Sequence, residues 1–484
     1  MALGSLSTHP VATKLKVKEQ SAKEVLRLCF VFAVGLSLYF FAHPEGVSQE
    51  GWILFSVFVS TILAIVVKPL PMGAVSILAV SCLVTTKAVE LHTVLQGFSN
   101  DLIWLIVMSC FLARGFIKTG LGRRIAYAFV SLFGGTPLGL GYGFLLSATT
   151  MAPLIPSATA RTAGITLPVL ESIIDVINDE KKGTRIAEFL TIIVLNGSVI
   201  SSCMFLTSNG GNPIAAKFAR DFGIHLSWGT WALAAIVPAL ISVALIPLIV
   251  KWVIPCHVPD AGKVRRHAKE ELHAMGPMGS KEKITIGVFA LLVLFWSCGN
   301  FFSIQATEAA ILGVGLFLIT RVLSWKDVLN EELAWDTFFW MAILIMMAAE
   351  LRHLGVVTYF TERITSFIPC YNWQIAFAVL ALIYFYTHYF FASTTAHLSS
   401  MFTPFVGILL SLGAPPLATA FAFAFMTNLF GGFTQYSSGP APILYAQGHI
   451  DLKTWLKVGA VTGVAYLIIW LGIGSCWWHF IGLL

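Results

Sequence analysis

Charged residues are scarce in this chain. Asp, Glu, Lys and Arg make up 11% of its 484 residues, whereas 57% are hydrophobic and the mean hydropathy is +0.83. So little polar surface cannot cover a soluble globule of this length. The composition therefore excludes a soluble protein and indicates a polytopic membrane protein.

The motifs of several other chemistries are missing. The eight cysteines include no C-x-x-C pair and no metal-ligand spacing, so we expect small apolar side chains rather than disulfides or ligands. No glycine-rich phosphate loop and no Ser-His-Asp order stands out, which argues against ATP-driven transport and against an enzyme. We therefore expect no cofactor and no bound metal.

Basic residues gather in three clusters that flank apolar runs. They lie before the first run (14–27), after the fourth (118–124) and in a polar insert (263–269). Such clusters are typical of the cytoplasmic side, where anionic lipid headgroups, and not nucleic acid, are their neighbours. Residues 1–26 lack the short apolar core of a cleavable signal peptide, so we interpret them as a cytoplasmic tail.

About eleven apolar windows are long enough to cross roughly 30 Å of hydrocarbon as helices, which predicts an all-α fold. They place a first repeat at 27–255 and a second at 284–484, joined by a cytoplasmic polar insert at 256–283. Two further stretches, 125–170 and 366–398, are interrupted by Gly, Pro, Ser and Thr. Irregular backbone survives at membrane depth only where protein or a wet cavity satisfies its amides, so we predict a re-entrant hairpin in each.

Each predicted hairpin carries a hydroxyl-rich tripeptide followed by a basic side chain. The first reads Ser157-Ala158-Thr159 with Arg161, and the second reads Ser393-Thr394-Thr395 with His397, 236 positions later. A span start with Asp and Trp and a Gly/Pro-broken loop (207–213 and 431–440) recur in the same order. Because an odd number of spans separates the copies, we predict two repeats of inverted topology with a site at their interface.

We interpret the two tips and the two broken loops as one split site for a small anion. A dicarboxylate away from water needs hydrogen-bond donors at both ends and compensating positive charge. Hydroxyls and the amides at half-helix N-termini can supply the donors, and Arg161 and His397 can supply fixed charge. The candidate substrate ligands are Ser157, Thr159, Arg161, Ser393, Thr394, Thr395, His397, Asn209, Thr434, Ser437, Ser438 and Pro440.

Several of these residues also have a structural interpretation. Hydroxyls in membrane helices often bond back to the preceding turn. Arg161 could pair with a helix C-terminus or with Glu171, and His397 could be a neutral interior histidine. We interpret His388 as structural, because it has no counterpart in the other half, and Asp336 as a cap of its own span.

Fixed charge at the site has a consequence for transport. With an anion bound the site is close to neutral, whereas the empty site carries unneutralised positive charge in a medium of low dielectric. We therefore expect the empty site to cross the membrane slowly. This favours obligatory exchange of one anion for another over net uptake.

Three runs carry a family resemblance: RGFIKTGLG at 114–122, YTHYFFAS at 386–393 and GGFTQY at 431–436. They resemble the divalent anion:sodium symporter superfamily, and within it the plastid 2-oxoglutarate/malate translocators and bacterial dicarboxylate or citrate/succinate antiporters. The resemblance extends over nearly the whole chain. It implies a homodimer in the lipid bilayer, eleven spans plus two hairpins per protomer, and an elevator-type movement of a transport domain past a scaffold domain.

The family signature at each hairpin tip is Ser-Asn-Thr, whose Asn helps to hold Na⁺ in the symporters. Both asparagines are missing here, and the resemblance implies substrate contacts at Ser157, Thr159, Ser393 and Thr395. We therefore expect a sodium-independent antiporter that exchanges 2-oxoglutarate for malate or a similar dicarboxylate, such as succinate or fumarate. A sodium-coupled dicarboxylate symporter is the alternative, and a channel or a membrane-embedded hydrolase is the hypothesis from another class.

The expected location is a bacterial inner membrane, with a cytoplasmic N-terminus, because the segment that starts at Met1 is short. A plastid inner envelope is the alternative.

Overall fold

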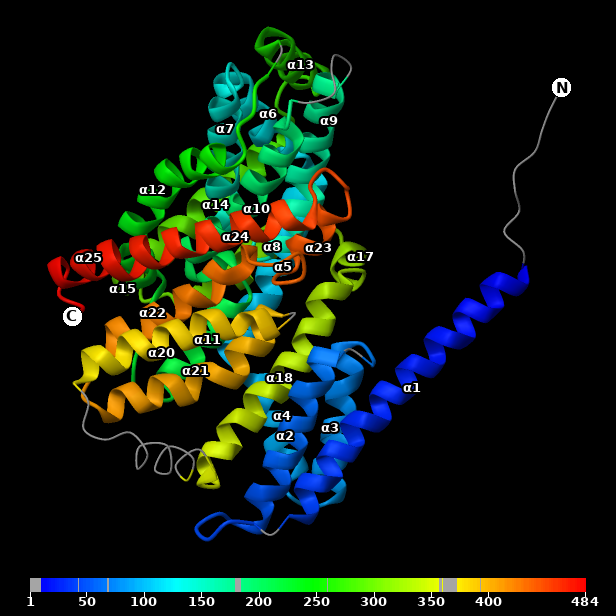
Figure 1. The fold of residues 1–484 in the computed structure, drawn as a ribbon, viewed down its shortest axis with the longest axis vertical. Coiled ribbons are helices and arrows are strands. Elements are labelled where there is room, and N and C mark those ends of the chain that lie inside the picture. Colours follow the sequence, from blue (N-terminus) through cyan, green and yellow to red (C-terminus); the bar gives the residue numbers. More distant parts are fainter. Residues whose placement is uncertain are drawn as a thin grey trace. The chain divides into compact units, whose positions relative to one another are not determined.

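The computed structural model describes residues 10–41, 43–67, 69–178, 184–258, 260–356, 359, 372–391 and 393–484 (Figure 1). Throughout these ranges the chain is helical or irregular, and no strand occurs in them. Within the same residues, six helices are long and apolar enough to cross a membrane, and four shorter apolar helices accompany them. The prediction of an all-α polytopic membrane protein is confirmed. The count of eleven spans, the inverted relation of the repeats and the elevator movement stay predictions.

Long apolar runs become helices because backbone amides in lipid must be satisfied within the segment itself. The six long segments are α5 (Asp101–Thr119), α10 (Ile186–Met204), α12 (Trp228–Val253), α18 (Glu332–His353), Trp373–Phe390 and Leu452–Phe480. The shorter ones belong to α2 (Gln49–Val67), α3 (Met72–Thr85), α16 (Ala306–Ile319) and α22 (Pro416–Leu429). Further helices are α4 (Leu91–Gln96), α14 (Ser280–Ser297), α15 (Gly299–Phe302), α17 (Trp325–Leu329) and α23 (Pro440–Tyr445).

The chain forms two compact units. The larger consists of residues 101–335 and 364–484, and the smaller of residues 1–100 and 336–363. Each predicted repeat contributes residues to both units, so this division does not test the predicted domain boundaries. All candidate site residues belong to the larger unit.

The first predicted hairpin contains the expected helix break. Helix α7 (Pro137–Met151) ends before Pro153 and Pro156, which cannot donate the backbone hydrogen bonds that would continue it. The chain becomes helical again at α8 (Ala158–Arg161) and passes through a π-helical turn into α9 (Leu167–Asn178). The tripeptide therefore lies at the start of a helix that follows a break.

The second predicted hairpin repeats this arrangement. Helix α20 (Trp373–Thr387) passes into a 3-10 turn at His388–Phe390, and α21 (Thr394–Ser411) follows the break. Residues 366–371 and Ala392 of the predicted stretch lie outside the described residues. Helix α21 continues well beyond the predicted end at residue 398, because the apolar sequence after the tip keeps helical periodicity.

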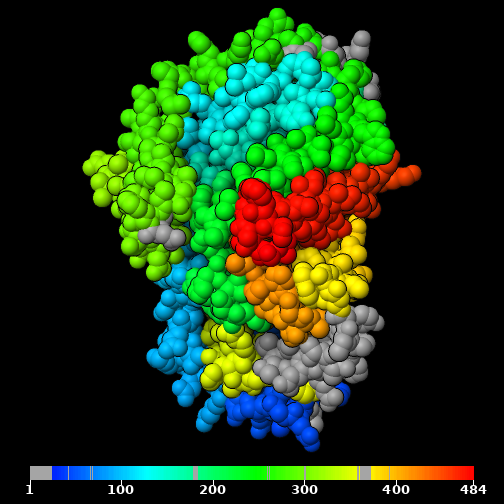
Figure 2. Space-filling view, turned by 90° about the vertical axis from the view of Figure 1, so that its left-hand side faces the viewer, coloured from blue at the N-terminus to red at the C-terminus, as the bar shows by residue number. Residues whose placement is uncertain are grey.

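The other helices of the larger unit pack around these breaks. Helix α7 contacts α10 and α12, and α21 contacts α22 and α11 (Gly211–Arg220). The C-terminal run from α24 (Leu452–Leu467) to α25 (Gly474–Phe480) lies on the surface of this unit, in red in Figure 2, and contacts α12. The Trp470 indole N–H donates to Ser242 Oγ (3.0 Å) and fixes this run to α12.

The predicted polar insert folds onto the same unit. Its helix α13 (Ala261–Ala274) lies beside α6 (Leu121–Phe133) and α9 (Figure 1). Arg124 of α6 donates to Glu282 Oε1 at 2.7 Å and to the carbonyl oxygen of Gly276 at 2.9 Å. Two basic segments that the charge pattern places on one side of the membrane thus lie together.

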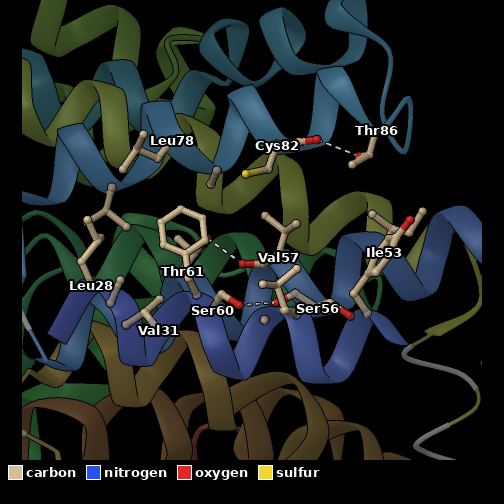
Figure 3. Close-up of a pocket in the computed structure, with 17 residues that line it drawn as sticks. Leu28, Val31, Ile53, Ser56, Val57, Ser60, Thr61, Leu78, Cys82 and Thr86 are labelled. Atoms are coloured by element: carbon tan, nitrogen blue, oxygen red, sulfur yellow. Dashed lines mark hydrogen bonds between the residues drawn. The ribbon is translucent and has the colours of Figure 1, made fainter. Parts of the chain in front are cut away.

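In the smaller unit, α1 (Pro10–Phe40), α2 and α3 line an apolar cavity of about 240 Å³ (Figure 3). Four hydroxyls of the lining donate to carbonyl oxygens of the preceding helical turn: Ser56, Ser60, Thr61 and Thr86. Their donors are used locally, so the lining stays apolar.

Asp336 caps a helix other than its own. It lies inside α18, and its Oδ1 accepts a hydrogen bond of 3.0 Å from the Gly73 amide in the first turn of α3. The N-cap position of α3 is Pro71, whose side chain accepts no bond. The interpretation of Asp336 as a cap of its own span is therefore wrong, because the carboxylate serves an orphan amide of α3.

Candidate functional site

The two tips use equivalent serines as helix caps. Ser157 Oγ accepts a hydrogen bond from the Ala160 amide (3.1 Å), and Ser393 Oγ accepts one from the Ala396 amide (3.3 Å). Both serines have extended backbone conformation, as N-cap residues do. Each cap bond uses a lone pair of the hydroxyl and leaves its hydrogen for another acceptor. The long helix α21 also directs its N-terminal amides toward its tip, an arrangement that suits an anion.

The two broken loops share one hydrogen-bond pattern. Ser208 Oγ donates to the carbonyl oxygens of Ser202 and Phe205, both at 2.7 Å, and accepts from the Phe205 amide at 3.4 Å. Ser437 Oγ donates to the carbonyl oxygens of Gly431 (2.8 Å) and Thr434 (2.9 Å). It also accepts from the Thr434 amide at 3.3 Å. In both loops the serine thus binds the residues six and three positions before it.

Each predicted hairpin packs against the loop of the other half. A Cβ added to Gly439, in the second loop, would lie 2.1 Å from Thr159 Oγ1 of the first tip. A Cβ added to Gly211, at the end of the first loop, would lie 3.7 Å from Leu398 Cδ2 of the second hairpin. The four elements of the predicted site therefore meet in crossed pairs.

Asn428, at the end of α22, joins the second half to the first loop. Its Oδ1 accepts from Asn209 Nδ2, and its Nδ2 donates to Asn212 Oδ1 at 2.7 Å. Asn212 in turn donates to the carbonyl oxygens of Ser202 (2.8 Å) and Phe205 (2.9 Å). This chain of amides holds Asn209, a candidate ligand, at a fixed place within the loop.

Arg161 is buried, with 1% of its surface exposed, and four oxygens surround its guanidinium. Nη1 donates to the carbonyl oxygens of Ile155 and Ser208, and Nη2 donates to the hydroxyls of Ser201 (3.3 Å) and Ser202 (3.0 Å). A guanidinium has five N–H donors, so these contacts leave Nε–H, which is buried without a partner among the described residues. Arg161 can therefore act on an anion through its charge and Nε, but not through a two-pronged Nη contact.

Arg161 has no acidic partner in the described part of the chain. Glu171, the carboxylate that sequence suggested for it, instead accepts from His449 Nε2 at 2.9 Å. The interpretation of Arg161 as half of an ion pair with Glu171 is therefore wrong. Its positive charge is buried among neutral oxygens, where it costs free energy until an anion comes near.

His388 makes the contact in the second half that Arg161 makes in the first. Its Nε2 lies 2.7 Å from the carbonyl oxygen of Ser437, just as Arg161 Nη1 binds the carbonyl oxygen of Ser208. Nothing in the sequence indicates this contact, because His388 has no counterpart at the equivalent position of the first half. In the sequence, Arg161 and His397 form a pair because each lies four positions after the serine of its tip. His388, by contrast, precedes its tip.

His397 lies in an aromatic surrounding and is 0% exposed. Its Nε2 lies 3.1 Å from Thr387 Oγ1, and its ring contacts those of Tyr384 (centroids 4.5 Å apart), Phe430 (4.8 Å) and Phe391 (4.9 Å). This is the environment of a neutral interior histidine, which was the alternative interpretation. Its role as a substrate ligand stays a prediction.

The remaining candidates differ in what they can still offer. Thr159, Thr394 and Thr395 are half-buried at the tips. Ser438 Oγ already donates to the Gly431 carbonyl oxygen at 2.6 Å, and Pro440 is buried at the start of α23. Thr434 Oγ1 is buried and has no partner among the described residues, so its hydroxyl is available.

Sequence analysis missed five residues of this arrangement: Ser201, Ser202, Asn212, His388 and Asn428. Ser201 and Ser202 follow one another inside a long apolar helix, a signal that could have marked them as interior ligands. The role of Asn428 depends on contacts with residues more than 200 positions away, which no local pattern reveals.

A cavity of about 860 Å³ adjoins the first loop. Its lining includes Leu206, which directly precedes that loop, and Trp228, together with Asp101 and Arg220, whose side chains form an ion pair of 3.3 Å. The Trp228 indole donates to Thr207 Oγ1 at 3.1 Å. The Trp228 indole therefore lines the cavity and is also hydrogen-bonded to the loop.

The described residues contain no group of three or more His, Cys, Asp or Glu side chains that could hold a metal ion. Sodium in transporters is bound by backbone carbonyls at broken helices. In the first half, two carbonyl oxygens of this kind converge with two hydroxyls on Arg161, and its guanidinium already binds all four.

Comparison with known proteins extends over the whole chain. The family described as "Sodium:sulfate symporter transmembrane region" matches residues 22–484. "Dicarboxylate transporter 1, chloroplastic" of Arabidopsis thaliana is 40% identical, over 100% of this chain and 88% of that protein. The "Putative malate transporter YflS" of Bacillus subtilis is 41% identical, over 98% of this chain and 100% of that protein.

Among solved structures, MtrF of Neisseria gonorrhoeae, from a class described as antimetabolite efflux pumps, superposes with a TM-score of 0.51. The match covers 98% of this chain and 96% of that one at 14% sequence identity. At this identity the likeness concerns the fold alone.

Proposed function

This chain belongs to the sodium:sulfate symporter family, and we propose that within it the chain exchanges 2-oxoglutarate for malate, or similar C4 and C5 dicarboxylates, without sodium. Membership confirms the family resemblance and makes the chain a multi-pass membrane transporter, not an enzyme. The names of relatives about 40% identical, a dicarboxylate transporter and a malate transporter, support the substrate class.

The observation that carries the proposal is the buried guanidinium of Arg161, which contacts no carboxylate in the described residues. A charge in such a place is heavily penalised unless a counter-ion neutralises it. A substrate anion that enters between the tips can be this counter-ion. The site therefore favours anions over neutral solutes and cations.

The site has two similar halves, which suits a substrate with a carboxylate at each end. Each tip begins a helix with a capping serine whose hydroxyl hydrogen is free to donate, and each hairpin packs against the loop of the other half. A dicarboxylate can place one carboxylate at each tip, with Ser157 and Thr159 at one end and Ser393, Thr394 and Thr395 at the other. Asn209 and Thr434 can add donors from the loops, and Ser437, Ser438 and Pro440 belong to the second loop, whose backbone amides can face the first tip.

Sodium independence rests on the oxygens around Arg161. Four oxygens of the first half that could otherwise bind a cation are hydrogen-bonded to the guanidinium, and both tip tripeptides lack the asparagine of the symporters. A fixed cation thus takes the place of a mobile one. This arrangement also supports exchange, because an empty site keeps its uncompensated charge and crosses the membrane reluctantly.

The elevator-type movement, the homodimer and the division into repeats 27–255 and 284–484 belong to the same proposal. So do the bacterial inner membrane as location, with a plastid envelope as alternative, and the cytoplasmic position of the N-terminus.

The test is counterflow in liposomes that contain the purified protein. Liposomes are preloaded with malate, with 2-oxoglutarate or with neither, and uptake of labelled 2-oxoglutarate is followed with and without Na⁺. We expect saturable uptake only into preloaded liposomes, at a rate that Na⁺ does not change. Uptake into empty liposomes that requires an inward Na⁺ gradient would instead establish the sodium-coupled symporter, and unsaturable flux would establish a channel.

A further inference from the structure

We propose that His388 is a positioning residue of the substrate site and the second-half counterpart of Arg161. This inference rests on the proposed function and deepens it. It assigns to the second half a neutral hydrogen-bond donor where the first half has a permanent cation. The site then has one fixed charge rather than the two that Arg161 and His397 together would give.

The equivalence follows from the loop serines. Ser208 and Ser437 make the same bonds to the residues six and three positions before them, so their carbonyl oxygens occupy equivalent places in the two loops. Each of these carbonyl oxygens binds a nitrogen of the hairpin in its own half, from Arg161 or from His388. Each contact therefore supplies a hydrogen-bond donor to a loop carbonyl oxygen. In the chain, Arg161 follows its tip, whereas His388 precedes its own.

The surroundings of His388 fix its tautomer and its orientation. Because a carbonyl oxygen can only accept, Nε2 must carry the hydrogen in the neutral ring. Nδ1 then has no hydrogen, and it is buried without a partner among the described residues. The ring also stacks on Phe430, with centroids 3.8 Å apart, and is 0% exposed. His388 is thus held as a neutral donor aimed at one acceptor.

This bond acts on the other tip through the second loop. Gly439, two residues after Ser437, lies directly against Thr159 of the first tip. Loss of the donor at residue 388 leaves the Ser437 carbonyl buried and unpaired, which favours a shift of the loop. Thr159 then loses the surface that holds it, and the affinity for the anion falls. The folded protein can still change conformation during transport, so we expect the main effect on KM and not on Vmax.

The experiment compares three variants in the counterflow assay. His388→Leu removes the donor at similar volume, and His388→Gln keeps an N–H donor at similar reach. His479→Leu changes an exposed histidine near the C-terminus and is the control. We expect KM for 2-oxoglutarate to rise about tenfold in His388→Leu, to stay within about threefold of wild type in His388→Gln, and to be unchanged in the control. A destabilised fold would lower the amount of active protein and Vmax, but not KM.

A second readout does not depend on transport. Amide hydrogen exchange of segment 434–440 should quicken in His388→Leu and stay close to wild type in His388→Gln. A His388→Leu variant with wild-type KM and wild-type exchange of this segment would overturn the inference, and so would a His388→Gln variant as impaired as His388→Leu in both. If the wild type exchanges no dicarboxylate, the proposed function fails, and the segment's hydrogen exchange still decides the positioning role.

Discussion

Ser208 and Ser437, 229 positions apart, close their loops with the same three hydrogen bonds. The neighbouring sequences differ, with Asn209 after one serine and Ser438 after the other, so the recurrence lies in geometry more than in residue identity. It supports the proposed internal duplication. It also means that the two loops should respond alike when these hydroxyls are removed.

Ser208→Ala and Ser437→Ala should therefore destabilise the protein by similar amounts. Each substitution removes one buried hydroxyl donor that two carbonyl oxygens share, at a cost of about 0.5 to 1.5 kcal/mol. Thermal unfolding in detergent, together with KM for exchange, measures the effect. Ser81→Ala is the control, because the Ser81 hydroxyl donates to the preceding turn on an exposed helix surface. Loss of stability in only one of the two loop variants would contradict their equivalence.

Replacement of Arg161 separates its charge from its hydrogen bonds. Arg161→Met removes both, so exchange should become undetectable. Arg161→Lys keeps the charge but lacks the planar fork that serves four oxygens, so exchange should persist at about a tenth of the wild-type rate or less. Size-exclusion chromatography verifies the fold, and Arg266→Met, at an exposed position in the polar insert, is the control. Exchange at the wild-type rate by Arg161→Met would show that transport does not need the Arg161 side chain.

Gly439 should tolerate no side chain. A methyl group there would lie 2.1 Å from Thr159 Oγ1, so Gly439→Ala must turn the Thr159 side chain out of its place or displace the first tip or the second loop. We expect exchange to fall by at least about tenfold, which corresponds to 1.4 kcal/mol of lost affinity or mobility. Gly315→Ala is the matched control, since nothing lies within 4 Å of the added methyl group. Equal rates for the two variants would show that the crossed contact does not matter.

The ion pair of Lys118 with Asp327 gives a pH dependence of stability. The hydrogen bond from Lys118, with further bonds from Ser324, holds the pKa of Asp327 well below its ordinary value of 3.8. Because the folded pKa is lowered, this stabilisation is fully present above the ordinary value and is lost as the pH falls through the lowered one.

Lys118→Met and Asp327→Asn should each lower the free energy of unfolding by about 0.5 to 1 kcal/mol at pH 7, a range suited to a partly exposed pair. The difference from wild type should shrink as the pH is taken from 4 toward 2. Thermal unfolding across this range provides the measurement. A difference that stays constant would show that the pair does not stabilise the fold through its charge.

The positions of the breaks could be predicted from sequence because local chemistry decides them. Pro153 and Pro156 cannot donate backbone hydrogen bonds, and Ser157 and Ser393 are good helix caps directly before apolar runs. These signals need no knowledge of tertiary contacts. The structure therefore has helix breaks at the two places where the sequence predicts them.

The partners of the site could not be predicted in the same way. His388 and Arg161 lie on opposite sides of their tips, and a repeat needs to keep only the contact with the loop carbonyl, not the spacing along the chain. Asn428 is bonded to Asn212, 216 positions away, through helix packing that no local pattern encodes. For the same reason, sequence could not show that Glu171 pairs with His449 and leaves Arg161 without a carboxylate.

The most direct test of the central claim is an experimental structure of the membrane-reconstituted protein with bound 2-oxoglutarate in sodium-free buffer. We expect one carboxylate at the Ser157 tip and the other at the Ser393 tip, with the Arg161 guanidinium still bound to the Ile155 and Ser208 carbonyl oxygens. A dicarboxylate bound away from both tips, or an Arg161 side chain displaced from these oxygens so that a cation can bind there, would contradict this claim.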